Sequence, residues 1–368
     1  MSHTESALPP HAPAPSANRR EGNIELLRIV CMLLIMAHHM VYHSSAMQTP
    51  QPVNRVIARV LFAGGMTGVN CFVMITGYFL APFRAKRLLS ILLETLLYSV
   101  GITLILYLTG LKRDITWETL KNAALVASRS PYWFVVMYLG LTAVLPLLQP
   151  GVKALSRNAH RWVLAAGTAY LCLIPTFTFQ DPSSQFFHQI TWFFYLYALG
   201  AYFKKFPSRG EGWLPVHGGL FLLMVAFIAA STLWGDQHTE LFQRVGSRQN
   251  FFADKNTLPQ LVCSVALFRF FAGLRVRASK SLLFLSSASF GVYLIHDHNL
   301  LRAFLWRDWG RVWQSAQGDG FFLTALLLPA GLYLACAGID WLRRRYLEGP
   351  LLKKLTPLTD RIDRWMAK

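Results

Sequence analysis

The sequence predicts an all-α polytopic membrane protein, a bundle of about ten transmembrane helices with both termini in the cytoplasm. Of its 368 residues 54% are hydrophobic, and the mean hydropathy is +0.35. The apolar residues form long runs nearly free of charge, whereas a soluble protein of this length would show amphipathic elements. The formal net charge is +18, but the Lys and Arg residues lie between the apolar runs and not on one basic domain. This distribution favours membrane topology and argues against nucleic acid as a partner.

The chain divides into a tail at 1–22, a membrane domain at 23–345 and a basic cytoplasmic C-terminal tail at 346–368. The first segment is rich in Pro, Ala and Ser and has neither an apolar core nor a small-residue cleavage site. We therefore expect a disordered cytoplasmic tail and not a signal peptide. Arg19 and Arg20 precede the first apolar run and are expected to hold this end in the cytoplasm.

Ten apolar runs are candidate spans. They cover residues 24–46, 60–80, 88–109, 132–150, 162–180, 189–203, 216–235, 257–272, 282–301 and 320–342. The runs at 189–203 and 257–272 are shorter than the roughly 20 residues that a straight span needs, so we expect them to be broken, tilted or partly re-entrant. The segment DITWETLKNAALVASRS, between the third and fourth runs, has helical periodicity and predicts an outward-facing interfacial helix.

Basic residues cluster in the loops after the even-numbered spans and at the C-terminal end. They are Arg84, Lys86, Arg87, Lys153, Arg157, Arg161, Lys204, Lys205, Arg209, Arg275, Arg277, Lys280, Arg343, Arg344, Arg345, Lys353 and Lys354. The other loops hold nearly all of the loop acids. An even number of spans with both termini inside satisfies the positive-inside bias.

Several kinds of site are not expected. All five cysteines lie inside apolar runs without CxxC or Cys/His spacing, so neither a disulfide framework nor a metal site is predicted. No serine–histidine–acid motif and no Gly-rich phosphate loop is present.

The first span carries two ionisable residues, Arg28 and His39, in NIELLRIVCMLLIMAHHM. Their spacing of eleven residues makes about three helical turns, so both point to one side about 16 Å apart along the axis. Ionisable groups in a membrane span indicate a buried polar site. His38 is rotated about 80° from that side. A histidine there can be a general base, a proton relay or a ligand, and a hydrogen bond between helices remains an alternative.

The second span ends in GVNCFVMITGYFLAPFRAKR, where Asn70 and Tyr78 add polar groups to an apolar run. Arg84 and Arg87 follow one helical turn apart, with Lys86 between them. Paired guanidinium groups bind phosphates bidentately, so this sequence predicts an anion clamp. Charge that only sets the membrane topology is the alternative.

The ninth span ends in SASFGVYLIHDHNLLRAFLW, which brings His296 to about the depth of His39, with Tyr293 one turn earlier and Asp297 following at the outer interface. An aqueous mouth without catalysis would also explain these residues. Trp133, at the start of the fourth span, suits a sugar-stacking platform or an aromatic belt. The residues assigned to an outer substrate cavity are Asn70, Tyr78, Trp133, Tyr293, His296 and Asp297.

The buried acids Glu94 and Asp340 are expected to pair with basic neighbours, and Glu25 to neutralise Arg28.

Four segments together resemble the acyltransferase-3 family of integral membrane acyltransferases. They are ELLRIVCMLLIMAHH, GVNCFVMITGYFL with the following RAKR, YWFVVMYLGLTAVLPLL and SFGVYLIHDHNLLRAFLW. The likeness is nearest to the subgroup that resembles the enterobacterial common antigen O-acetyltransferase, which has no fused soluble domain. The resemblance implies a ten-helix core in the bacterial inner membrane that uses cytoplasmic acetyl-CoA to acetylate a hydroxyl of a cell-surface glycan.

The resemblance also implies residue roles. It assigns Arg28 and His39 to catalysis, with His38 as the alternative base, and Arg84 and Arg87, with Lys86 beside them, to the CoA phosphates. The predicted function is an O-acetyltransferase of polysaccharide biosynthesis, an acyltransferase of groups other than aminoacyl groups. Its acceptor is a polysaccharide or its lipid-linked precursor, His39 is the general base, and no metal takes part. A proton-coupled transporter or flippase and a membrane scaffold are the alternatives.

Overall fold

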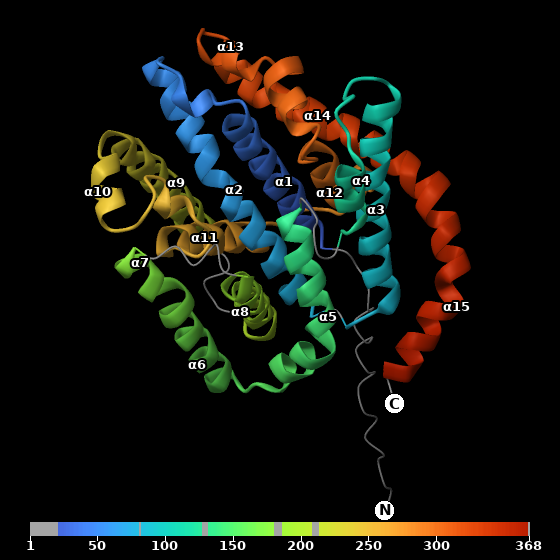
Figure 1. Ribbon diagram of the computed structural model, residues 1–368. Coiled ribbons are helices and arrows are strands. Elements are labelled where there is room, and N and C mark those ends of the chain that lie inside the picture. The colour runs from blue at the N-terminus through green and yellow to red at the C-terminus, as the bar shows by residue number, and fades with distance from the viewer. Residues whose placement is uncertain (1–20, 81, 127–131, 180–185, 208–212, 367–368) are drawn as a thin grey trace, which may run out of the picture.

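The computed structural model describes residues 21–80, 82–126, 132–179, 186–207 and 213–366, and within these ranges its elements are helices joined by loops, without a strand (Figure 1). Each of the ten predicted runs contains a helix. These helices are α1 (Gly22–His43), α2 (Pro52–Tyr78), α3 (Ala85–Leu108), α5 (Trp133–Ala154), α6 (Arg157–Thr168) with α7 (Ile174–Thr178), α8 (Phe186–Lys205), α9 (Leu214–Gln237), α11 (Leu258–Gly273), α12 (Lys280–His296) and α14 (Phe321–Arg343). The all-α class is confirmed.

Six of the helices in the described ranges are long and apolar enough to cross a membrane. They are α1, α2, α3, α5, α9 and the continuous helical stretch that begins with α14. The fifth run is interrupted, because the π-helical turn η2 (Ala169–Leu173) separates α6 from α7. Of the two runs expected to be short, α11 has 16 residues, whereas α8 extends to 20. The structure therefore supports a membrane bundle, and the count of ten spans stays a prediction.

Helices α1 and α2 lie side by side in the middle of the bundle (Figure 1). Helix α1 also packs against α12, and α2 also packs against α8. Close approach of α1 and α2 depends on Gly65, where an added Cβ would lie 2.3 Å from the ring of His38. A glycine face of this kind lets two helices meet without a hydrophobic driving force between them.

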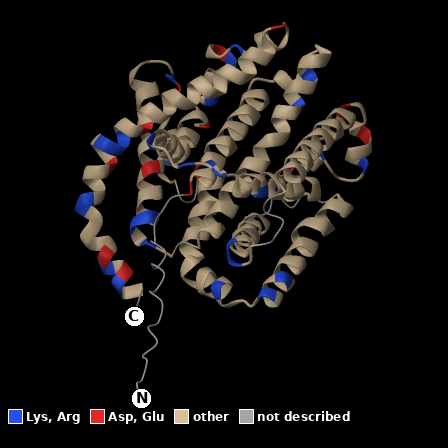
Figure 2. Cartoon of the chain, turned by 180° about the vertical axis from the view of Figure 1, so that it is seen from behind, with Lys and Arg blue, Asp and Glu red and all other residues tan. Residues whose placement is uncertain are grey.

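Large apolar side chains cover the outside of the bundle. Leu104, Ile105 and Leu108 of α3 and Leu222 and Leu223 of α9 are all exposed. A contiguous apolar exterior is unfavourable in water and suits lipid. Figure 2 shows long uncharged stretches of helix, with basic and acidic residues gathered toward helix ends and loops.

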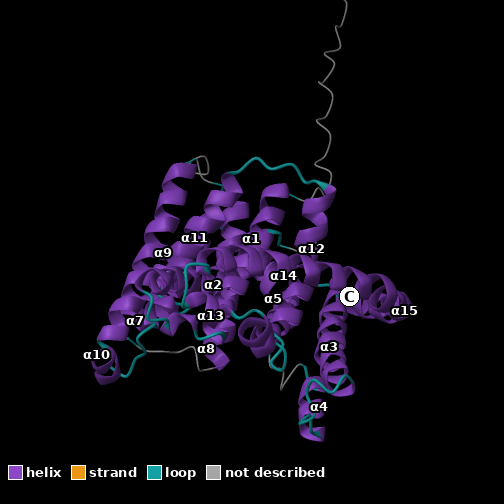
Figure 3. Ribbon diagram, turned by 90° about the horizontal axis from the view of Figure 1, so that it is seen from above, coloured by secondary structure: helices purple, strands orange, loops and turns teal. Residues whose placement is uncertain are grey.

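Shorter elements complete the fold. They are η1 (Ala46–Gln48), α4 (Trp117–Ala124), α10 (Thr239–Arg244), η5 (Phe251–Ala253), η6 (Phe304–Trp309), α13 (Val312–Ala316), η7 (Arg344–Glu348) and α15 (Gly349–Met366). Helix α4 falls within the segment predicted as an interfacial helix, of which residues 127–130 lie outside the described ranges. The predicted basic C-terminal tail is helical: α15 contacts α3 and projects from the edge of the bundle (Figure 3). The tail predicted at 1–22 falls, up to residue 20, outside the described residues.

Candidate active site

A cavity of about 1440 Å³ opens between α1, α2, α3, α5 and α12. Helix α1 contributes one side of its surface to the wall, through Glu25, Arg28, Met32, Ile35, His38 and His39. Arg28 and His39 therefore face one space, as their spacing predicts, about 16 Å apart along the helix axis. We call the part of the wall with His39 and Tyr293 the His39 end, and the part with Arg84 and Arg87 the Arg84 end.

At the His39 end, two hydrogen bonds fix the protonation of the His39 ring. His296 Nδ1 lies 2.7 Å from the carbonyl oxygen of Val292, which can only accept, so this nitrogen carries a proton. In neutral His296 the other nitrogen, Nε2, is then an acceptor, and it lies 3.0 Å from His39 Nδ1. His39 must donate this bond, which leaves the lone pair of the neutral ring on Nε2. A histidine in this form can take up a proton at Nε2.

His38 also lines the cavity but is held differently. Its ring stacks on Phe62 with centroids 4.4 Å apart, and its Nδ1 donates to the Phe62 carbonyl oxygen at 2.7 Å. The side chain is thus fastened to α2. His39 is joined instead to His296 of α12, so the two neighbours belong to different networks.

At the Arg84 end, two arginines stand at the start of α3. Arg84 precedes the first residue of the helix, and Arg87 donates to the Tyr138 hydroxyl at 2.6 Å. Within the described ranges no carboxylate lies at ion-pair distance from Arg84 or Arg87. Other cations on this wall are compensated, because Arg28 pairs with Glu25 at 3.7 Å, as predicted, and Lys204 with Glu21 at 2.5 Å. The uncompensated pair can hold a polyanion such as a phosphate group.

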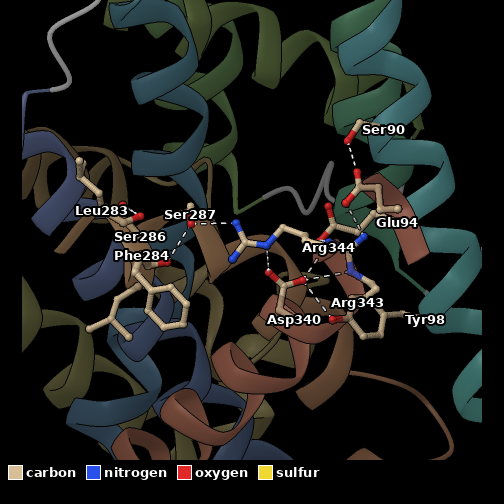
Figure 4. A network of polar contacts seen from close by, with 12 residues as sticks. Ser90, Glu94, Tyr98, Leu283, Phe284, Ser286, Ser287, Asp340, Arg343 and Arg344 are labelled. Carbon is tan, nitrogen blue, oxygen red and sulfur yellow. Dashed lines mark hydrogen bonds and ion pairs between the residues drawn. The ribbon is translucent and has the colours of Figure 1, made fainter. Parts of the chain in front are cut away.

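Beside the cavity, buried charges join α3 to the end of α14 (Figure 4). The Arg343 side chain is 4% exposed and pairs with Glu94 at 3.0 Å, Asp340 at 2.9 Å and Glu348 at 2.7 Å. Arg344 pairs with Asp340 at 2.8 Å and donates to Ser287 of α12 at 2.9 Å. The prediction that Glu94 and Asp340 pair with basic neighbours is confirmed, because Glu94 pairs with Arg343 and Asp340 pairs with both arginines. We call Arg343, Arg344, Glu94, Asp340 and Glu348 the Arg343 cluster.

Sequence reasoning missed this role of Arg343 and Arg344, because it took them as charges at the cytoplasmic end of the last span. A signal was present, since Asp340 precedes them by three and four residues on the same helix. The close approach of α12 depends on Gly291, where an added Cβ would lie 2.1 Å from an Asp340 carboxylate oxygen.

Of the residues predicted for an outer substrate cavity, Trp133 and Tyr293 line the wall. Asn70 does not, because it is fully buried, donates to the Lys255 carbonyl at 2.8 Å and accepts from Trp192 at 3.0 Å. It thereby ties α2 to α8. Tyr78 is bonded at 3.1 Å to Glu21, beside Lys204. Tyr78 is not part of the wall itself, but its partner Glu21 and the neighbouring Lys204 line the cavity on the side of the Arg84 end.

His296 and Asp297 lie behind His39 and are not part of the wall. Asp297 is 3.6 Å from His39 and also 3.6 Å from His43. Lys86 differs from its neighbours Arg84 and Arg87, because it is exposed and outside the cavity wall. The site therefore consists of Arg84, Arg87 and Arg28 on one side and His39, backed by His296, on the other.

A family model described as an acyltransferase domain, that of the acyltransferase-3 family, matches residues 21–344. No curated protein and no solved structure matches the chain.

Proposed function

Since the chain belongs to the acyltransferase-3 family and is a membrane acyltransferase, we propose that it moves an acetyl group from acetyl-CoA to a hydroxyl of a bacterial cell-surface polysaccharide or its lipid-linked precursor. The observation that carries the proposal is one cavity with Arg84 and Arg87 at one end and His39 at the other. In this proposal the protein lies in the bacterial inner membrane with both termini and the Arg84 end in the cytoplasm.

The donor occupies the Arg84 end. CoA carries several phosphate charges, and a polyanion is stable only where cations and water meet it. Arg84 and Arg87 supply two guanidinium groups that no described carboxylate neutralises. The uncharged pantetheine arm then enters the cavity and carries the thioester toward His39. Arg28 lies about 16 Å from His39 along α1, so it contacts this arm and not the reacting carbonyl.

The acceptor hydroxyl meets the thioester beside His39. Nε2 of His39 removes the hydroxyl proton as the oxygen attacks the thioester carbonyl. The carbon–sulfur bond then breaks, the acetyl group stays on the acceptor oxygen, and the CoA sulfur takes the proton from His39. His296 supports the step because its bond to His39 keeps Nε2 free of a proton beforehand. Transfer through an acetyl-histidine is a variant with the same residues.

The test is acetyl transfer by the purified protein in liposomes that contain a lipid-linked glycan fraction from the cell envelope. Labelled acetyl-CoA is added on one side, and CoA release and label in the glycan are followed. The proposal expects CoA release that depends on the glycan, with one acetyl group transferred for each CoA. Movement of the glycan across the membrane without consumption of acetyl-CoA would contradict it and favour the transporter.

A further inference from the structure

Three side chains that can bind metal converge at His39, and two of them, His43 and Asp297, are not part of the cavity wall. His39 and His43 lie one turn apart on α1, and Asp297 follows the last residue of α12. Their ligand atoms, His39 Nδ1, His43 Nε2 and an Asp297 carboxylate oxygen, all lie within 4.8 Å of one another. The oxygen is 3.6 Å from each of the two nitrogens.

These distances are close to those of a tetrahedral metal site. Zinc binds imidazole nitrogen and carboxylate oxygen at about 2.0–2.2 Å, which sets neighbouring ligand atoms roughly 3.3 Å apart. The two distances to Asp297 exceed this value only slightly. The two histidines must approach each other further, and side-chain rotation on one helix face allows it. Two imidazoles and one carboxylate suit zinc and its first-row neighbours better than magnesium or calcium.

The carboxylate of Asp297 provides the second observation. Its side chain is 7% exposed, and its Oδ1 is buried without a hydrogen bond in the part of the chain that the structure describes. A buried carboxylate oxygen in this state is costly unless a cation approaches it. Arg302 is near at 3.8 Å, beyond hydrogen-bond distance, and its side chain is 37% exposed. The oxygen that faces both histidines can therefore donate a lone pair to a metal ion.

We propose that His39, His43 and Asp297 form a binding site for a divalent transition-metal ion such as Zn²⁺. Coordination uses the lone pair of His39 Nδ1, so the ring can no longer donate from this atom to His296. The proton of the neutral ring then resides on Nε2, where it blocks proton uptake. Metal binding and the base form of His39 exclude each other, and the ion is a reversible inhibitor of transfer. The inhibition rests on the proposed function, whereas the binding does not.

Binding is measured on the full-length protein, after removal of any affinity tag, by calorimetry with Zn²⁺ and by the visible absorption of tetrahedral Co²⁺. His43→Ala is expected to weaken Zn²⁺ binding by at least about 100-fold and to abolish the Co²⁺ bands. If His43→Ala does not fold, His43→Gln removes the same ligand with a side chain of similar size. His238→Ala is the matched control, because this exposed histidine at the end of α9 bonds to the Trp234 carbonyl one turn earlier, and its loss should leave metal binding unchanged.

Arg302→Ala separates a metal site from a merely structural cluster. Removing a cation 3.8 Å from Asp297 should strengthen Zn²⁺ binding several-fold, whereas a structural ion pair would only lose stability. In the transfer assay Zn²⁺ should inhibit the wild-type protein, and a chelator should restore activity. The rate of His43→Ala, compared with its own rate in the absence of Zn²⁺, should not fall when Zn²⁺ is added.

The results distinguish the two proposals. Zn²⁺ binding that depends on His43, in a protein without acetyl transfer, would sustain the metal site and overturn the proposed function. Absence of the Co²⁺ bands in wild-type protein, or equal Zn²⁺ affinity in wild type and His43→Ala, would overturn the metal site whatever the transfer assay shows.

Discussion

The Arg343 cluster and the Arg84 end contain the same residue type in opposite electrostatic states. Arg343 is buried and surrounded by three carboxylates, which hold α3, α14 and η7 together. Arg84 and Arg87 stand at the start of α3 on the same cavity and have no described carboxylate partner. A compensated arginine in a membrane bundle stabilises the fold, whereas an uncompensated one is available for an anionic ligand. The comparison predicts that substitutions at the two places affect different measurements.

The largest effect is expected for Arg343→Met. The substitution leaves Glu94, Asp340 and Glu348 buried with Arg344 as their nearest remaining cation. Removing one partner of a buried ion pair costs about 3–5 kcal/mol. Thermal unfolding in detergent should show a much lower Tm for this variant. A Tm within a degree or two of the wild type would mean that the cluster does not stabilise the fold.

Arg84→Ala with Arg87→Ala should leave the Tm unchanged and raise the KM for acetyl-CoA. Charged hydrogen bonds contribute about 1.5–3 kcal/mol each, so the KM should rise by at least about 10-fold while kcat changes little. Lys86→Ala is the matched control, since Lys86 lies between the two arginines but outside the cavity wall. An equal rise in KM for Lys86→Ala would mean that the effect comes from general surface charge and not from a site formed by Arg84 and Arg87.

Gly291→Ala tests the contact of α12 with the Arg343 cluster. The added methyl group would lie 2.1 Å from an Asp340 oxygen, so the carboxylate, which Arg343 and Arg344 hold in place, or the helices themselves must shift. Overpacking of this kind costs about 1–3 kcal/mol, visible as a lower Tm. Gly338→Ala on α14 is the control, because its Cβ would meet nothing within 4 Å. Equal Tm values for the two variants would contradict the importance of this contact.

The smallest effect is expected for Tyr138→Phe, which removes the hydroxyl that accepts from Arg87 at 2.6 Å. Loss of one hydrogen bond corresponds to about 0.5–1.5 kcal/mol, or roughly a 2- to 10-fold change in the KM for acetyl-CoA. Steady-state kinetics would show it. An unchanged KM would mean that Arg87 does not need this hydroxyl to meet the donor.

Local patterns predicted a large part of this molecule. The apolar runs located the helices, and the helical repeat placed Arg28 and His39 on one side of α1, because both depend on neighbours in the sequence. The pattern RAKR also predicted Arg84 and Arg87 one helical turn apart, and both stand at the start of α3.

The rotation and packing of helices could not be predicted in the same way. Asn70 and Trp133 looked alike as polar or amphipathic residues near a presumed mouth, yet only Trp133 reaches the cavity. The rotation of α2 against α8, which decides this, depends on distant parts of the chain. The convergence of His39, His43 and Asp297 likewise joins α1 to the end of α12. Only the one-turn spacing of the two histidines was visible in the sequence.

The most direct test of the account compares His39→Gln with His38→Gln in the glycan-dependent transfer assay. Glutamine cannot take up a proton, so His39→Gln should lower kcat by about 10²–10⁴-fold with the KM for acetyl-CoA nearly unchanged. His38→Gln, which loses a residue fastened to α2, should lower kcat by less than about 10-fold. A kcat of His39→Gln within about 2-fold of the wild type, in correctly folded protein, would contradict His39 as the base.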